Sequence, residues 1–224
     1  MLKRFRYVLR ELADVFRGMT SARRRARFGD MDFDWDHRVD TTMSNVRLGT
    51  RLKGVLAGSQ YQAADPGLFA EGMAALPIDF SRYIFIDAGS GKGRALLMAS
   101  EYPFRKVLGI EVVPELHAAA ESNIALFPRE RRKAVIVESR LADALSFEWP
   151  CEPTVLFLFN PFPEWVLQQF LERLRISLRE SPRKVWVVYH NPVLRALLLE
   201  TAFLNEVSYS LQAAMFTNDA PEPQ

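Results

Sequence analysis

Short apolar runs alternate with amphipathic segments along the chain from Tyr83 onward. The runs are continuous stretches of Val, Ile, Leu and Phe, a pattern typical of parallel strands that helices cover on both faces. Alternating strands and helices predict an α/β fold with a doubly wound, mostly parallel sheet. We expect strands at Tyr83–Asp87, Lys106–Glu111, Ala134–Glu138, Thr154–Asn160 and Lys184–His190, helices at Gly93–Glu101, Pro114–Phe127, Glu164–Leu178 and Val193–Ala202, and one or two closing strands within Phe203–Thr217.

The first 60 residues have a different pattern and predict an N-terminal helical extension. Apolar residues recur at three- and four-residue spacing over residues 2–19, which predicts an amphipathic helix, and residues 42–58 are also expected to be helical. Asp65 and Pro66 then supply an N-cap and a first-turn proline, so a helix is expected from there to about Leu76. We therefore expect an extension over residues 1–60 and a main domain over residues 61–224.

Charge separates the same two regions. Residues 1–28 contain nine basic and two acidic residues, a net charge of +7, whereas the remaining residues contain 20 basic and 25 acidic residues, a net charge of −5. A nucleic-acid footprint over the whole domain is therefore not supported. The basic segment 1–28 is interpreted as a docking helix with a solvated polar face, or as a peripheral contact with an anionic membrane surface or a partner.

Residues 30–40 are acidic, with five aspartates and His37. They lack the glycine and distal glutamate that a calcium loop needs, so we expect a solvated loop or a partner for the basic segment. The single cysteine, Cys151, excludes a disulfide framework and a cysteine-based zinc site, and the three histidines lack metal-ligand spacing. No metal site is predicted. Without a long apolar run or a secretory signal pattern, a cytoplasmic location is expected.

The strand expected to end at Asp87 leads into a loop with three glycines at alternate positions, Asp87-Ala88-Gly89-Ser90-Gly91-Lys92-Gly93. Glycine has no Cβ and tolerates positive φ, so such a loop can approach a ligand closely. A phosphate-binding P-loop is excluded because Gly93 stands where that motif requires Ser or Thr. A dinucleotide fingerprint is disfavoured because Arg94 occupies its third glycine position, so NAD is not the expected cofactor.

This stretch resembles motif I of class I S-adenosylmethionine (SAM) methyltransferases, and the resemblance extends over about residues 61–217. It implies the Rossmann-like fold of those enzymes, with SAM as cofactor and S-adenosylhomocysteine (SAH) as product. The first acid of the motif, here Asp87, contacts the SAM amino group in that family. The residues implied to hold the methionine part of SAM are Asp87, Gly89, Ser90, Gly91 and Gly93.

Two further acids support the resemblance, each following a later strand. Glu111 ends the second expected strand, where a carboxylate can accept hydrogen bonds from both ribose hydroxyls. Asp143 follows the third and matches the acid that lies near the adenine amino group. Both are implied cofactor-binding residues.

The wider pattern looks like a bacterial branch of these enzymes, on the residues Phe33-Asp34, Val39-Asp40-Thr41 and Asn160-Pro161-Phe162. It is also loosely similar to Dot1-like protein-lysine methyltransferases, which share a tyrosine upstream of motif I. That similarity implies that Tyr61 closes over SAM.

The fourth strand is followed by Asn160-Pro161-Phe162-Pro163, which resembles the Asn-Pro-Pro-aromatic motif of enzymes that methylate amide or amino nitrogens. The resemblance implies that Asn160 and Pro161 accept hydrogen bonds from the target nitrogen and that Phe162 stacks on it. Asn160 is also expected to touch the cofactor. The aromatic residue comes one position early, so adenine or glutamine specificity does not follow. A strand-ending turn is the alternative interpretation.

His190 ends the fifth strand, at the edge of the sheet where ligands bind in open α/β folds. It is a candidate general base, or else a helix-capping or core residue. The sequence thus favours a SAM-dependent methyltransferase that acts on a nitrogen of a protein or a small molecule. The alternative is a non-catalytic SAM-binding scaffold that its basic N-terminal helix recruits. Acceptor identity and oligomeric state are not predicted.

Overall fold

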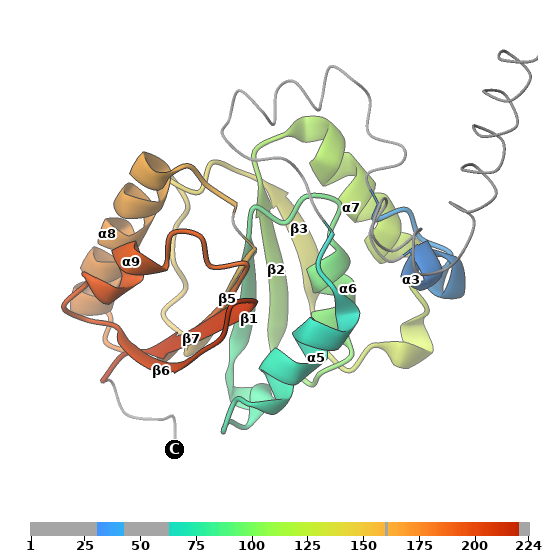
Figure 1. The fold of residues 1–224 in the computed structure, drawn as a ribbon. Helices are drawn as coiled ribbons and strands as arrows, with labels where there is room; N and C mark the ends of the chain where they lie inside the picture. The colour runs from blue at the N-terminus through green and yellow to red at the C-terminus, as the bar shows by residue number, and fades with distance from the viewer. Residues whose placement is uncertain (1–30, 43–62, 160, 220–224) are drawn as a thin grey trace, which may run out of the picture.

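The computed structural model describes residues 31–42, 63–159 and 161–219 (Figure 1). These residues form a seven-stranded sheet in the order β3-β2-β1-β4-β5-β7-β6. The first five strands are parallel, and β7 runs antiparallel to both β5 and β6. The expected doubly wound, mostly parallel sheet is confirmed, as are two closing strands. The strands are β1 Ile84–Ala88, β2 Lys106–Glu111, β3 Val137–Leu141, β4 Thr154–Phe159, β5 Val185–His190, β6 Asn205–Tyr209 and β7 Ala213–Thr217.

Helices cover both faces of this sheet, with α5, α6 and α7 on one side and α8 and α9 on the other (Figure 1). Side chains of α5 and α6 pack with Phe85 and Phe157 in one hydrophobic core, and side chains of α8 and α9 pack with Ile86 and Leu156 in a second. The strands β1 and β5 are buried at every position because both of their faces are covered. The helices are α3 Met31–His37, α5 Pro66–Ala74, α6 Arg94–Ser100, α7 Pro114–Leu126, α8 Glu164–Glu180 and α9 Arg195–Leu199, with short 3-10 turns at Phe80–Arg82 and Arg129–Arg131.

The helix expected at Pro66 begins as predicted. The Asp65 carboxylate accepts a hydrogen bond of 2.9 Å from the Leu68 amide, and Pro66 occupies the first turn, where its missing N–H costs nothing. The helix ends at Ala74, two residues before the expected end.

The third strand lies three residues later than expected. Residues Ala134 and Val135 form no ladder, because their amides donate to the carbonyls of Ser100 and Phe104, in and after α6. The strand pairs with β2 from Val137 onward and is the edge of the sheet, so polar residues are tolerated within it. The apolar run that predicted Ala134–Glu138 is thus only partly strand, and Val135 is 80% exposed.

The expected solvated loop at residues 30–40 is wrong. Residues Met31–His37 form helix α3, and Phe33 and Val39 belong to the hydrophobic core that also contains α5 and α6. The His37 ring stacks between Phe33 and Phe127, with ring centroids 4.3 and 5.2 Å away. The helices predicted at residues 2–19 and 42–58 lie outside the described residues, apart from Thr42.

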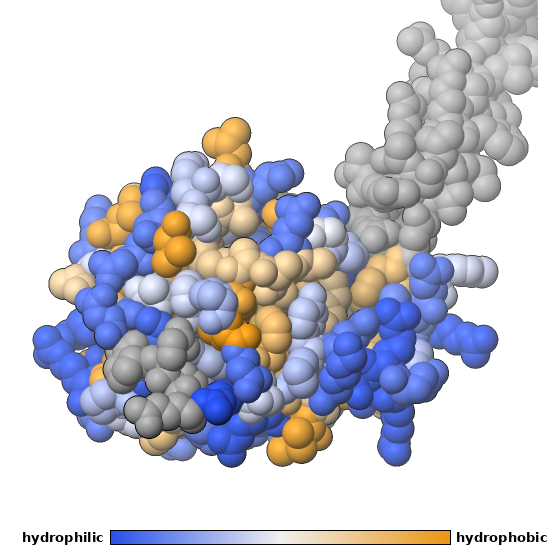
Figure 2. Space-filling model, turned by 90° about the horizontal axis from the view of Figure 1, so that it is seen from below, coloured by the Kyte–Doolittle hydropathy of each residue, from blue (hydrophilic) through white to orange (hydrophobic). Residues whose placement is uncertain are grey.

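Figure 2 views the molecule from below, and its described surface is mostly hydrophilic around a moderately hydrophobic central band. Within residues 31–42, 63–159 and 161–219, no helix is long and apolar enough to cross a membrane.

Candidate functional site

The glycine loop joins β1 to α6 and bends at each glycine. Gly89, Gly91 and Gly93 have φ values of 79°, 54° and 83°, a region that side chains disfavour. The Gly89 and Ser90 amides both donate to the Ile110 carbonyl of β2, at 2.9 and 3.0 Å. The loop is therefore tied to the neighbouring strand, and the Gly93 amide closes a turn on the Ser90 carbonyl at 2.8 Å.

Gly89 also brings the loop after β1 against the loop after β4. A Cβ atom on Gly89 would lie 2.6 Å from the Pro161 Cβ, closer than real Cβ atoms approach. The two loops that we expected from the sequence to hold the cofactor and the methyl acceptor are therefore in direct contact. Asn160, between β4 and Pro161, lies outside the described residues, as does Tyr61.

Ser90 points away from the open side of the loop. A Cβ atom on Gly109 of β2 would lie 2.6 Å from the Ser90 Oγ, so the hydroxyl packs against that strand. The Oγ is buried and has no hydrogen-bond partner among the described residues. The hydroxyl thus fills space beneath the loop, whereas the Ser90 backbone shapes it.

Asp87 lies at the carboxyl end of β1 with its side chain 4% exposed. No donor among the described residues contacts its carboxyl group. Burial, and secondly the charge of Glu111, raise the pKa of Asp87 from 3.8 to about 8. A buried carboxyl group without a donor is costly to ionise, and a bound cation would reverse that cost.

Glu111 lies at the end of β2, next to β1 in the sheet. Its Oε2 accepts a hydrogen bond of 2.8 Å from the Gly91 amide, and its Oε1 accepts one of 2.8 Å from the Val113 amide. Burial raises the pKa of Glu111, while these backbone donors oppose that shift. Each carboxylate oxygen has a second lone pair, so Glu111 can fix the glycine loop and still accept hydroxyl groups.

Asp143 follows β3 and is exposed. Its Oδ1 accepts from the Leu145 amide at 2.9 Å, which closes a turn. The preceding amide, of Ala142, donates to the Glu111 carbonyl at 3.0 Å. The structure thus places Asp87, Glu111 and Asp143 at or just after the carboxyl ends of three neighbouring parallel strands.

Phe162 packs on helix α8. Its ring centroid lies 5.3 Å from that of Phe170, and the side chain is partly buried in the second core. Pro161 is likewise partly exposed. Within this structure the Phe162 ring supports the start of α8, so stacking on a target nitrogen stays a prediction.

His190 ends β5 and is fully buried. Its ring lies edge-on to the rings of Phe157 and Phe159, with ring centroids 4.7 and 6.3 Å apart. Neither ring nitrogen has a hydrogen-bond partner among the described residues. Burial lowers the pKa of His190 from 6.5 to about 4, although the nearby charge of Asp65 opposes that shift. His190 is therefore neutral at pH 7, so at least one ring nitrogen is an available acceptor.

Two cations of the glycine loop were missed as site residues by sequence reasoning. Both are buried: Lys92 pairs with Asp40, just after α3, and Arg94 pairs with Asp34, within α3. Buried cations need partners, but the sequence alone does not indicate which acids supply them. Among the described residues, no group of three or more His, Cys, Asp or Glu side chains could hold a metal ion.

Comparison with known proteins identifies the fold. No protein-family model matches the sequence, and a search of curated proteins finds no match. The chain is similar to a dimethyladenosine transferase from Plasmodium falciparum, at TM-score 0.51 and 13% identity over 72% of this chain and 64% of that one. It is similar to a possible methylase from Clostridium difficile 630, at TM-score 0.50 and 14% identity over 73% of this chain and 54% of that one.

A further similarity, at TM-score 0.47 and 21% identity, is to an RNA methyltransferase from Salinibacter ruber in complex with S-adenosyl-L-homocysteine, over 73% of this chain and 96% of that one. Likeness at these identities concerns the fold. The two matches with TM-scores of 0.50 and 0.51, together with the seven-stranded sheet and its antiparallel β7, show the Rossmann-like fold of class I SAM-dependent methyltransferases.

Proposed function

We propose that the protein is a SAM-dependent methyltransferase that acts on a nitrogen atom. One observation carries the proposal: two buried carboxyl groups, Asp87 and Glu111, end adjacent parallel strands on either side of a glycine loop. Ligands of open α/β sheets bind at this edge. The fold supports the same cofactor class.

The described residues fit SAM at two places. The Asp87 carboxyl group is buried and receives no hydrogen bond from the described part of the chain, and the ammonium group of SAM would supply the missing positive charge. Glu111 keeps lone pairs for the ribose hydroxyls while it holds the Gly91 amide. Gly91, at φ 54°, keeps the backbone bare where the cofactor would lie.

When bound, SAM supplies a methyl group on a sulfonium leaving group that is already activated. The protein then has to position a nitrogen lone pair in line with that methyl group and exclude water. The contact between Gly89 and Pro161 supports such positioning, because it fixes the acceptor loop directly on the cofactor loop. Asn160 and the carbonyl of Pro161 would then accept hydrogen bonds from the target N–H.

The acceptor class follows less directly. A protonated amine must lose a proton before it attacks. Buried His190, with its pKa lowered to about 4, is too weak a base to take that proton from an ammonium group, so the amine would have to reach the site already neutral. The resemblance to Dot1-like protein-lysine methyltransferases would place an amine of a protein there. It depends on Tyr61, outside the described residues. We therefore propose a protein or small-molecule amine.

Calorimetric titration with SAM and SAH tests the cofactor. The wild type should bind both, and Gly91→Arg should bind neither, because the added side chain would occupy the cofactor position. Gln169→Arg adds the same side chain on the exposed face of α8 and should bind like the wild type. An absence of binding heat with both ligands for a folded wild type would refute the proposal.

Labelling a source-cell extract with tritiated SAM tests the activity. The extract is separated into protein, nucleic-acid and small-molecule fractions after incubation with wild type or Gly91→Arg. The protein or small-molecule fraction should take up more label with the wild type than with Gly91→Arg, which measures the labelling by the extract's own enzymes. Label confined to nucleic acid would contradict the proposed acceptor class.

A further inference from the structure

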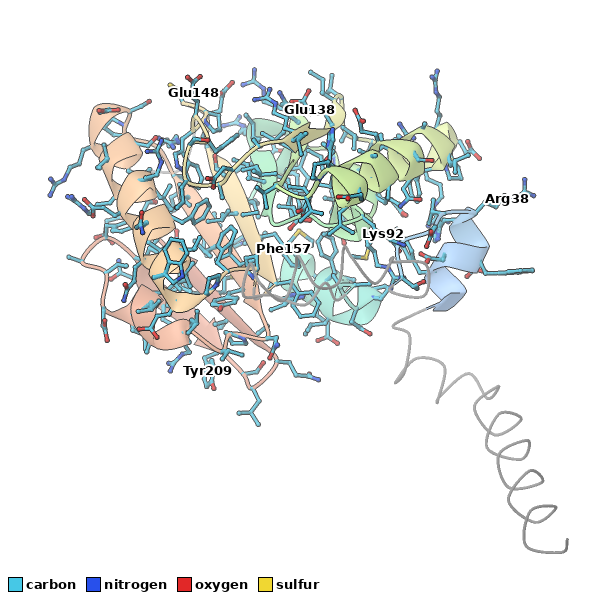
Figure 3. All side chains as sticks on the ribbon, turned by 90° about the horizontal axis from the view of Figure 1, so that it is seen from above. Arg38, Lys92, Glu138, Glu148, Phe157 and Tyr209 are labelled. Carbon is cyan, nitrogen blue, oxygen red and sulfur yellow. The ribbon has the colours of Figure 1, made fainter. Side chains whose placement is uncertain are left out.

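We propose that residues 34–42, which we name the acidic strap, position the glycine loop and hold it in the conformation that binds SAM. The proposal rests on the proposed function, because it concerns how the loop that would bind SAM is positioned. The strap comprises the second half of α3 and the five residues that follow it. It contacts Lys92 and Arg94, which lie on either side of Gly93. Figure 3 shows Lys92 directed toward α3, away from Phe157 at the centre of the molecule.

Arg94 forms the first connection. Its Nε donates to the Thr41 Oγ1 at 2.6 Å, and its terminal nitrogen donates to the Asp34 Oδ1 at 3.2 Å. The guanidinium carbon also lies 5.0 Å from the centroid of the Phe33 ring, in cation–π geometry. Asp34 in turn accepts the Thr41 hydroxyl and the amides of Thr41 and Thr42, so the acid shapes the strap while it binds the loop.

Lys92 forms the second connection. Its ammonium group donates to the Asp40 Oδ1 at 2.9 Å and to the Thr42 carbonyl at 2.8 Å. The side chain of Asn123, in α7, donates to the backbone carbonyls of Asp40 and Lys92 at 2.8 and 3.0 Å and accepts from the Asp40 amide at 2.8 Å. Asn123 therefore fixes strap and loop to each other and to the helix beneath them.

These contacts matter because the loop has little rigidity of its own. The five residues from Gly89 to Gly93 include three glycines, so this segment loses much backbone entropy when it is ordered. Lys92 and Arg94 flank Gly93, so the strap restrains the loop at two points before any ligand arrives. A ligand that binds the ordered loop pays less of that entropy, which raises its affinity.

Thr41 offers a test with a matched pair of variants. Thr41→Val keeps the shape but removes the hydroxyl that joins Asp34 to Arg94, whereas Thr41→Ser keeps the hydroxyl and removes a methyl group. We expect Thr41→Val to weaken SAH binding about tenfold, equivalent to about 1.4 kcal/mol, and Thr41→Ser to change it less than about twofold. If Thr41 acted through packing alone, Thr41→Ser would weaken SAH binding more than Thr41→Val.

A control variant in the second hydrophobic core distinguishes a general loss of stability from a loss of loop positioning. Leu174→Ala opens a cavity under α8, on the opposite face of the sheet, and should lower the melting temperature at least as much as Thr41→Val. It should leave SAH affinity within about twofold of wild type. Asp40→Asn, at a carboxyl group that is 46% exposed, weakens the Lys92 connection with little risk to folding and should weaken SAH binding severalfold.

The effect of SAH on amide hydrogen exchange in the strap is a measurement that a purely structural role would leave unchanged. The amides of Asp40, Thr41 and Thr42 all donate to side chains of the network, so SAH should slow their exchange in the wild type and less so in Thr41→Val. Unchanged exchange at these amides, together with wild-type affinity in Thr41→Val and Asp40→Asn, would overturn the strap while the SAM proposal stands. A folded wild type that binds no SAH would overturn both.

Discussion

Replacing Asp87 by Asn should stabilise the ligand-free protein at alkaline pH and weaken cofactor binding at the same time. Asp87 is buried beside Glu111, and these two causes raise its pKa from 3.8 to about 8. Asn has the same shape but no charge, so it removes the cost of ionisation and also removes the proposed partner of the SAM ammonium group. A residue retained only for stability would not show these opposed effects.

The sign and size of the stability effect follow from proton linkage. The unfolded chain releases the Asp87 proton near pH 4, whereas the folded protein keeps it up to about pH 8. The stability contribution of the protonated form is therefore complete below about pH 4 and is lost as pH rises to about 8. The loss is about 1.4 kcal/mol per pH unit well below pH 8 and half of that at pH 8, hence about 2 kcal/mol between pH 6 and pH 8. For a domain of this size that corresponds to about 4 to 8 °C in melting temperature.

Thermal melts of wild type and Asp87→Asn at pH 6, 7 and 8 measure this effect, because groups common to both proteins cancel in the difference. The melting temperature of Asp87→Asn relative to wild type should rise with pH. Calorimetry at pH 7.5 should show SAH bound about 10- to 100-fold more weakly, since a hydrogen bond to a charged group is worth about 1.5 to 3 kcal/mol. A pH-independent difference in melting temperature, or wild-type SAH affinity in Asp87→Asn, would refute the reasoning.

Three further predictions concern neighbouring residues. Gly89→Ala should reduce kcat more than SAH affinity, measured by turnover and calorimetry, because its Cβ would lie 2.6 Å from Pro161 and displace the acceptor loop; equal losses in both would contradict this. Glu111→Gln should weaken SAH binding about tenfold, because an amide accepts through one oxygen only and leaves the Gly91 or Val113 amide unpaired; Glu111→Ala should weaken it further, and unchanged calorimetric affinity would exclude the assigned role. The pH–rate profile should lack an acid limb near pH 6.5, since the pKa of His190 is lowered to about 4; a limb near 6.5 that disappears in His190→Gln would show that the ring is exposed during turnover.

The central part of the fold was predictable because its strands are buried on both faces. The run Lys106–Glu111 predicted β2 at its observed bounds, and β4 and β5 differ from expectation by one residue each. The prediction failed for β3, where the sheet ends. An edge strand has one neighbour and tolerates Glu138 and Arg140, so apolar content no longer marks its position.

The candidate site was predictable to the extent that parallel topology determines it. Carboxyl ends of neighbouring parallel strands meet at one edge, so Asp87 and Glu111 had to lie close together once β1 and β2 were identified. Which way a loop side chain points is a different matter. The Ser90 hydroxyl packs against Gly109, a contact set by how closely the loop approaches β2, and no sequence spacing reports that distance.

The acidic segment shows most clearly why local sequence was insufficient. Read alone, Asp34 and Asp40 predict exposure, because isolated carboxylates prefer water. Their partners, Arg94 and Lys92, are 60 and 52 residues away, and the sequence had marked Arg94 only as a departure from the dinucleotide fingerprint. Only the fold shows that these cations and the acids are one feature: two buried cations in and directly after a glycine loop are tolerated because a segment far away in sequence supplies their charge. It follows that Lys92 and Arg94 cannot be understood as motif residues alone, and that the acidic strap would have to change together with them.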